Sequence, residues 1–180
     1  MAADNDSLVR IYTIGHSTRS FDAFVALLDA HGVRRTADIR AIPHSRRHPQ
    51  FEREALAAAL GARGIGYWHF PELGGFRRPR RDSPNTGWSS GGFRGYADYM
   101  GTSAFDGALD RLLAFARVAP TAVMCAEAVW WRCHRGLLAD ALVLRRVEVL
   151  HITSSAAPAR HQLNPMARVV EGRVTYPSLS

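Results

Sequence analysis

The sequence predicts one α/β domain, a three-layer sandwich around a mainly parallel sheet of about five strands. Short β-rich runs alternate with longer runs of helical periodicity, and this order implies parallel strands joined by right-handed helical crossovers. The length of 180 residues suits one domain with its own core, and a hydrophobic share of 47% is ordinary for a globular protein. We expect the core over about 11–152, followed by an irregular tail at 153–180.

In the first half of the chain, the spacing of apolar residues marks two helices between three strands. Ser20 is a typical N-cap, and Gly32 suits the end of that helix because glycine readily adopts the left-handed conformation. Pro43 ends the second strand, since proline has no backbone N–H to donate. The predicted elements are a strand at 11–14, a helix between Ser20 and Gly32, a strand at 34–40, a helix at 50–63 and a strand at 65–70.

The second half begins with a loop at 76–92 that is rich in Arg, Gly, Pro and Ser and is too long for a simple connection. We expect a functional lid or a mobile loop, whose arginines would meet an anionic partner. Ser103 is expected to cap a helix that has Asp106 in its first turn. The predicted elements after the loop are a helix at 93–100, the helix after Ser103, a strand at 121–125, a helix at 136–146 and a strand at 147–152.

Composition excludes several classes of protein. No apolar run approaches the roughly 18 residues that span a bilayer. Residues 1–7 are polar and acidic, unlike a signal peptide. The chain has 2 cysteines, too few for a secreted disulfide scaffold. We therefore expect a cytoplasmic protein without membrane association, in which the thiols are usually reduced.

All 23 positions counted as Lys or Arg are arginine. A net charge of +7 fits a surface that binds phosphate or nucleic acid, and guanidinium groups suit two-pronged phosphate contacts. A compositional bias toward Arg and Ala would give the same charge without any partner. The sequence leaves both interpretations open.

Polar and reactive side chains follow the predicted strands at their carboxyl ends. In a parallel α/β sheet these ends share one edge, which is where ligands bind. The densest stretch is 125–135, with both cysteines, a carboxylate, a histidine and two arginines between a strand and a helix start. We expect a single site that gathers residues distant in sequence: His16, Ser17, Asp38, Arg40, residues 72–75, Cys125, Glu127 and His151.

These residues stand in motifs that follow one another in a defined order. The motifs are Thr13-Ile-Gly-His-Ser17, Asp38-Ile-Arg40 with Pro43 and Ser45, Leu73-Gly-Gly75, Phe93 with Tyr96 and Tyr99-Met100, and Cys125-Ala-Glu127 with Cys133-His-Arg135. In this combination, over about residues 11–152, the chain resembles the bacterial family of domain of unknown function 488. The resemblance implies a compact α/β bacterial domain in which these motifs belong together, and it implies no particular reaction.

Three residues are candidates for catalysis. Glu127 would act as general acid or base, and His16 would do the same or else hydrogen-bond a neighbouring carbonyl. Cys133 lies at a predicted helix start beside a histidine and an arginine, where the helix dipole and positive charge favour a thiolate nucleophile. The alternative for each cysteine is a buried packing role, which fits Cys125 at its strand end better.

Neither a redox motif nor a metal site is evident. The spacing of Cys125 and Cys133 is not that of a Cys-x-x-Cys centre. Adjacent Cys133 and His134 project in different directions from a helix start, so both rarely bind one ion. We therefore expect no bound metal.

Anion binding is the better supported use of this edge, because a helix N-terminus offers free N–H groups to a phosphate. Arg40 has the alternative of a structural ion pair with Asp38 or Glu127, and the glycine pair that of a tight turn. The predicted anion-binding residues are Arg40, Arg135, Ser17, Ser45, Gly74 and Gly75.

We therefore expect an enzyme, a hydrolase or transferase that acts on a phosphate-bearing small molecule, a nucleotide or a nucleic-acid end. Two alternatives stay open. One is a non-catalytic nucleic-acid or nucleotide binding module, and the other is a thiol-based redox or covalent-catalysis protein. Cofactor and oligomeric state are left undetermined by the sequence.

Overall fold

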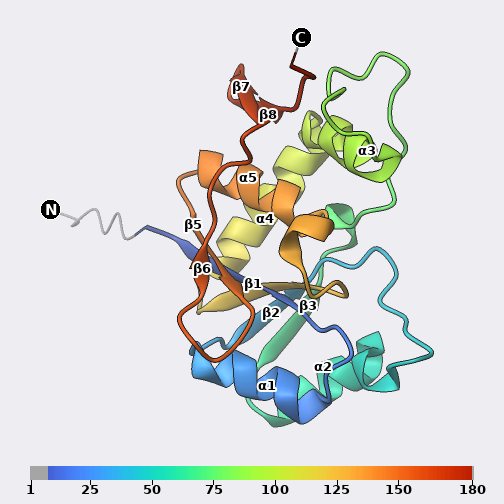
Figure 1. Cartoon of the computed structure of the whole chain (residues 1–180). Helices are drawn as coiled ribbons and strands as arrows, with labels where there is room; N and C mark the ends of the chain where they lie inside the picture. The colour runs from blue at the N-terminus through green and yellow to red at the C-terminus, as the bar shows by residue number, and fades with distance from the viewer. Residues whose placement is uncertain (1–7, 180) are drawn as a thin grey trace, which may run out of the picture.

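A computed structural model describes residues 8–179, so the interpretation of residues 1–7 as unlike a signal peptide lies outside the described residues. In the part described, the central sheet has six strands: β1 (Arg10–Gly15), β2 (Arg35–Asp38), β3 (Gly66–His69), β4 (Thr121–Cys125), β5 (Glu148–Ile152) and β6 (Ala159–Arg160). Their order across the sheet is β3-β2-β4-β1-β5-β6 (Figure 1). All pairs are parallel except β5 with β6, which confirms the predicted mainly parallel sheet.

Helices cover both faces of this sheet. Within residues 8–179 they are α1 (Phe21–Ala30), α2 (Arg53–Ala62), α3 (Gly91–Met100), α4 (Ser103–Ala116) and α5 (Arg135–Leu144). The first two pack on one face, and the other three pack on the opposite face (Figure 1). The three-layer sandwich predicted from the sequence is therefore confirmed.

Local chemistry determines where the helices begin and end. Ser20 Oγ accepts a hydrogen bond from the N–H of Ala23 at 3.1 Å, and Gly32, just beyond α1, has φ 68°. At α4 the capping side chain is that of Thr102, which accepts a hydrogen bond from the N–H of Phe105. The prediction of Ser103 as this cap is wrong by one residue, because neighbouring hydroxyl residues look alike as caps in a sequence.

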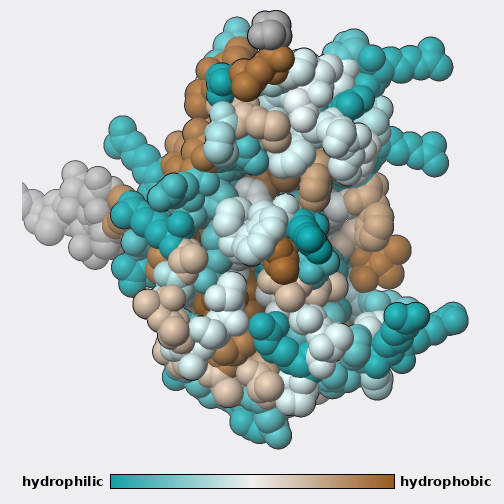
Figure 2. All heavy atoms as spheres, viewed as in Figure 1, coloured by the Kyte–Doolittle hydropathy of each residue, from teal (hydrophilic) through white to brown (hydrophobic). Residues whose placement is uncertain are grey.

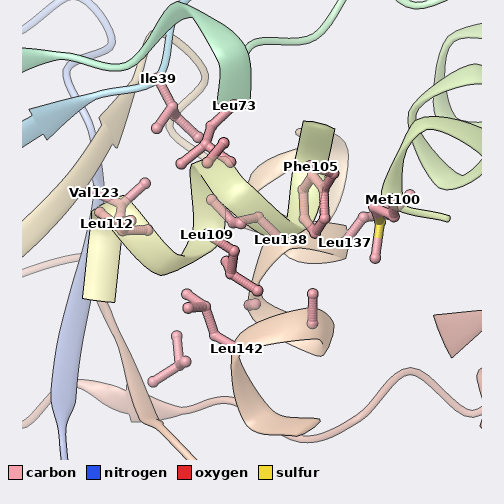
Figure 3. Packing of buried hydrophobic residues seen from close by; sticks show 14 of the residues in the cluster. Ile39, Leu73, Met100, Phe105, Leu109, Leu112, Val123, Leu137, Leu138 and Leu142 are labelled. Carbon is pink, nitrogen blue, oxygen red and sulfur yellow. The ribbon is translucent and has the colours of Figure 1, made fainter. Parts of the chain in front are cut away.

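Two apolar clusters fill the space between the sheet and the helix layers. In the larger one, leucines of α4 and α5 pack against Ile39 and Leu73 (Figure 3). The smaller cluster lies under α1 and α2 and includes Phe24 and Phe51. Helices on both faces bury every residue of β4, which explains why this strand is a continuous apolar run.

The crossovers open a crevice at the carboxyl edge of the sheet. β1 and β2 lead into α1 and α2 on one face, whereas β4, which lies between these two strands, leads into α5 on the other face. Loops that leave adjacent strands toward opposite faces part from one another. Such a switch point is where open α/β sheets bind ligands.

Asp98 on α3 anchors the arginine-rich loop. Its carboxylate accepts hydrogen bonds from the backbone N–H of Arg80 at 2.8 Å, from Ser83 Oγ at 2.6 Å and from Asn85 Nδ2 at 2.7 Å. Asn85 in turn accepts a hydrogen bond from the N–H of Tyr176 at 2.8 Å. The loop is therefore held more firmly than its Gly, Pro and Ser content predicts.

The tail is more ordered than expected. It adds β6 to the sheet and then forms a hairpin of β7 (Arg168–Val170) and β8 (Arg173–Thr175). The face seen in Figure 2 is mainly hydrophilic, with apolar patches that include this hairpin, where Val169 and Val170 are exposed. In residues 8–179, no helix has the length and apolar character needed to cross a membrane.

A buried chain of polar groups holds this tail. Asp140 on α5 accepts hydrogen bonds from Tyr176 OH at 2.6 Å and from His161 Nε2 at 2.8 Å. His161 Nδ1 lies 2.8 Å from Nε2 of His151 on β5, whose Nδ1 contacts Thr13 Oγ1 on β1. These contacts do not recur at a regular spacing in the sequence. The sequence pattern of the tail therefore does not predict that the tail has a defined structure.

Candidate functional site

A cavity of about 610 Å³ lies at the carboxyl ends of β1, β2 and β4. Its wall contains His16 after β1, Arg40 after β2 and Cys125 at the end of β4. Of the predicted catalytic and anion-binding residues, the structure thus brings together six, which are His16, Arg40, Ser45, Gly75, Glu127 and Cys133.

The other three, Ser17, Gly74 and Arg135, do not line this cavity, and neither do Asp38 and His151, which were expected at the same edge. Ser17 has a positive φ of 50°, and its N–H donates to the carbonyl of Ala126 at 2.9 Å. Gly74 is buried, and a Cβ there would lie 2.8 Å from Cα of Ala41. Both residues therefore hold loops close together, and their anion-binding roles stay predictions.

Arg40 is oriented by a buried ion pair with Asp38. Its Nη2 lies 2.7 Å from Asp38 Oδ2, and its Nε lies 3.0 Å from Oδ1. Asp38 also accepts a hydrogen bond from the hydroxyl of Tyr67 at 2.5 Å. Burial and the charge of Asp38 raise the pKa of Tyr67, so this hydroxyl stays a donor. The guanidinium group is therefore fixed where it reaches the wall.

His16 is buried beside Arg40, with its ring stacked on Phe51 at 4.2 Å between centroids. Its Nδ1 lies 2.8 Å from the carbonyl oxygen of Ser17, which can only accept, so Nδ1 carries the proton. The free lone pair of Nε2 faces Arg40 Nη1 at 3.4 Å. Burial, and then the charge of Arg40, lowers the pKa of His16 to about 4, so the ring is uncharged at neutral pH.

Glu127 carries the one carboxylate among the described residues of the wall. It is exposed, and its Oε1 accepts a hydrogen bond from the N–H of Val129 at 3.3 Å. The loop that carries it passes so close to β1 that a Cβ at Gly15 would clash with the Glu127 carbonyl. Its backbone position is therefore tightly defined, while its carboxylate faces solvent and cavity.

Cys125 and Cys133 contact each other in the wall, with their Sγ atoms 2.7 Å apart. Both are buried, free thiols. Their spacing in the sequence does not predict this contact. It arises because the short 3₁₀ helix Trp130–Arg132 turns the chain back toward the end of β4.

The contact makes the two thiols unequal. A hydrogen bond from Cys133, together with the nearby charge of Arg135, lowers the pKa of Cys125. The same contact and burial raise the pKa of Cys133. Cys125 is thus the more acidic thiol, whereas the sequence led us to expect Cys133. A nucleophilic role for Cys133 stays a prediction.

Arg135 lies behind the wall and is only 1% exposed. Its Nη2 donates hydrogen bonds to the carbonyl oxygens of Glu127 and Ala128 at 3.0 and 3.3 Å. Within the part of the chain that the structure describes, its Nε and Nη1 have no hydrogen-bond partner. Arg135 therefore supports the loop of Glu127 and does not offer donors to the cavity.

Several residues of the wall were not among the predicted catalytic and anion-binding residues. His134 sits at the start of α5, where Gly75 leaves room for its ring, and burial lowers its pKa to about 4. Arg132 contributes a further guanidinium group, and Ile42 and Phe76 form an exposed apolar rim. The available signal was the presence of large apolar residues in loops that follow strand ends.

No metal centre is evident in residues 8–179, because no three His, Cys, Asp or Glu side chains there are placed to hold an ion.

Comparison with curated proteins gave no match, and comparison with solved structures gave none. The pattern of the family described as domain of unknown function DUF488 matches residues 20–142. That segment is more than half of the chain and contains Arg40, Gly75, Glu127 and Cys133. The chain therefore belongs to the DUF488 family.

Proposed function

We propose that this protein is an enzyme, a hydrolase or transferase that acts on a small phosphate-bearing molecule in the cavity beside Glu127. The observation that carries the proposal is the combination in one wall of an exposed carboxylate with the guanidinium groups of Arg40 and Arg132. A cavity of about 610 Å³ falls in the size range of small-molecule sites. Its place at the switch point of the sheet agrees with that use.

The arginines would hold the anion. Asp38 orients Arg40, and a guanidinium group fixed in this way loses little further freedom when it binds phosphate. Arg132 is exposed, and its side chain has no hydrogen-bond or ion-pair partner among residues 8–179. These two groups supply a fixed and an adaptable contact to the same ligand.

Glu127 would move the proton. A carboxylate that makes a single backbone hydrogen bond is free to accept a proton from an attacking water or hydroxyl, or to donate one to a leaving group. His16 suits a supporting role, because its one lone pair faces Arg40 and its other nitrogen is bonded to a carbonyl. It therefore helps to position Arg40.

The test is a turnover screen with nucleoside phosphates and sugar phosphates, applied to the wild type and three variants. Glu127→Gln should lower kcat on any substrate found by a factor of about 100 or more and leave binding within a few-fold. Arg132→Ala should raise KM. Arg117→Ala is the matched control, because Arg117 is exposed at the opposite edge of the sheet, beside a different cavity. Full turnover by Glu127→Gln would rule out its assigned role.

Nucleic-acid binding is the second candidate, and one observation favours it. Several exposed arginines in the loops that supply wall residues make no side-chain hydrogen bond or ion pair within the described residues, namely Arg46, Arg47, Arg78, Arg81 and Arg132. By contrast, Arg80 pairs with Asp82, and Arg77 lies over the ring of Tyr99 and donates to the carbonyl of Glu72. Only part of the arginine-rich loop is therefore available to a partner.

The two candidates differ in their salt dependence. Binding of a single strand should weaken steeply with salt, and Arg78→Ala with Arg81→Ala should reduce the slope by about 0.7 for each lost phosphate contact. A titration of single-stranded DNA and RNA at two salt concentrations measures this slope. An unchanged slope would leave these arginines without a role in nucleic-acid binding.

A further inference from the structure

We propose that Cys125 and Cys133 form a redox-active dithiol, which peroxide oxidises to an intramolecular disulfide and a dithiol reductant restores. Cys125 ends β4, and Cys133 lies two residues before the start of α5. Their sulfur atoms are in contact at 2.7 Å. A disulfide bond is about 2.05 Å long, so bond formation requires only a small movement. The chain has 2 cysteines in total, so no other thiol competes for either partner.

Access to the pair is through the cavity. Both thiols belong to its wall, although neither is exposed on the outer surface of the protein. A molecule as small as hydrogen peroxide fits easily in about 610 Å³.

Arg135 provides a second, independent observation. A buried guanidinium group normally has an anionic partner, because an uncompensated buried charge is costly. In residues 8–179 Arg135 has no carboxylate partner, and two of its nitrogen atoms are unbonded. Its charge acts on both thiols, and its backbone N–H lies 3.5 Å from Cys133 Sγ. A thiolate in the Cys125–Cys133 pair would supply the missing negative charge.

The reaction balances with peroxide as the oxidant. The Cys125 thiolate attacks one oxygen of H₂O₂, the O–O bond breaks, and the departing hydroxide takes up a proton to leave as water. The resulting Cys125 sulfenic acid is then attacked by the sulfur of Cys133, which forms the S–S bond and releases a second water. Each thiol gives up one electron and one proton, and reduction by an external dithiol returns both.

Oxidation would also change the site. The disulfide closes a ring over residues 125–133, which includes Glu127, and it removes the thiolate that would compensate Arg135. The wall of the cavity therefore has two chemical states, one for each redox state of the pair.

The experiment is to treat the folded, fully reduced chain with an equimolar amount of hydrogen peroxide and then to denature and alkylate it. Most of the protein should then have no alkylatable thiol and a mass about 2 Da below that of the reduced chain. Treatment with dithiothreitol should restore both thiols. The product should elute from size-exclusion chromatography at the same volume as the reduced protein. Two alkylatable thiols, intermolecular disulfides, or separate sulfinic acids would each overturn the proposal.

Single variants test which thiol attacks. Cys133→Ser should accumulate a sulfenic acid at Cys125, trapped by a 1,3-diketone, at a rate at least about tenfold above that of Cys133 in Cys125→Ser. Circular dichroism confirms that each variant is folded. Equal rates, or faster oxidation of Cys125→Ser, would overturn the assignment of Cys125 as the attacking thiol. Because the readout is mass and not turnover, the result is independent of the proposed hydrolase or transferase activity.

Discussion

Gly15 is the residue on which the backbone position of Glu127 depends most directly. It ends β1, and its missing side chain lets the loop after β4 cross at a distance that no other residue permits. The same crossing is held by the hydrogen bond from the N–H of His16 to the carbonyl of Cys125 at 2.9 Å. The positions of Glu127 and of Cys125 therefore both depend on this close crossing of the two backbones.

Gly15→Ala should displace this loop and lower the free energy of unfolding by about 1–3 kcal/mol, the usual cost of overpacking. Gly61→Ala is the matched control, since that position on α2 has open space around it and alanine favours a helix by about 0.5–1 kcal/mol. Urea denaturation measures both changes. If Gly15→Ala were as stable as Gly61→Ala, the close crossing would be irrelevant to the fold.

The loop between Phe76 and Ser90 shows how one buried carboxylate organises an element without regular structure. Asp98 binds it at three points, and all three involve short hydrogen bonds. Because Phe76 and Ser90 also belong to the cavity wall, the same anchor sets the shape of the rim. This loop is therefore tied to α3 by the side chain of Asp98.

Asp98→Ala should release the loop, because it leaves three donors without their acceptor at a cost of about 1–3 kcal/mol each if they stay buried. We expect cleavage by trypsin after Arg80 or Arg81 to become at least about tenfold faster. Asp82→Ala is the control, since the Arg80–Asp82 ion pair is exposed and contributes little. Mass spectrometry of the digests measures the cleavage rates. Equal rates for the two variants would contradict the anchoring role of Asp98.

At the scale of the whole molecule, buried histidines make stability depend on pH. Burial lowers the pKa of His16 and His134 to about 4 and that of His151 to about 3. In the unfolded chain these rings take up protons as the pH falls through about 6.5, while in the folded chain they stay neutral. The unfolded state then binds more protons, so acid favours it.

The free energy of unfolding should therefore be constant near neutral pH and decrease as the pH falls from about 6.5 toward 4. Each histidine contributes at most about 1.4 kcal/mol per pH unit in this window. Urea denaturation at several pH values gives the slope, and His16→Gln should reduce it by one such contribution. A flat profile between about pH 6.5 and pH 4.5 would show that burial of these rings has no such effect.

Much of the fold can be predicted from the sequence, because helix spacing, helix caps and strand order depend on local patterns or on topology. Apolar spacing locates the helices, the Ser20 cap starts α1, and β4 is recognisable as a buried strand. Convergence of His16, Arg40 and Glu127 follows from parallel strands sharing one edge. The gathering of those residues thus needed no knowledge of side-chain contacts.

The remainder depends on contacts that have no period in the sequence. The approach of Cys125 to Cys133 results from the path of one loop, and the burial of Arg135 depends on carbonyl groups that any sequence presents. Asp98 and Asp140 are polar positions on helices and look like solvent-exposed residues until the segments that cover them are in place. Buried polar networks of this kind are recognisable only in three dimensions.

The central place of β1 also affects how the chain is made. Ile11 pairs with Thr121 on one side and with Val149 on the other, so β1 leaves the ribosome before either of its partner strands is synthesised. Closing such long loops is slow, because their entropy is lost before the contacts form. Until then both edges of β1 are open to pairing with other extended chains, which favours aggregation. A fragment restricted to residues 20–142 lacks β1, which lies in the middle of the sheet beside β4, and also β5 and β6. It should therefore aggregate when expressed alone.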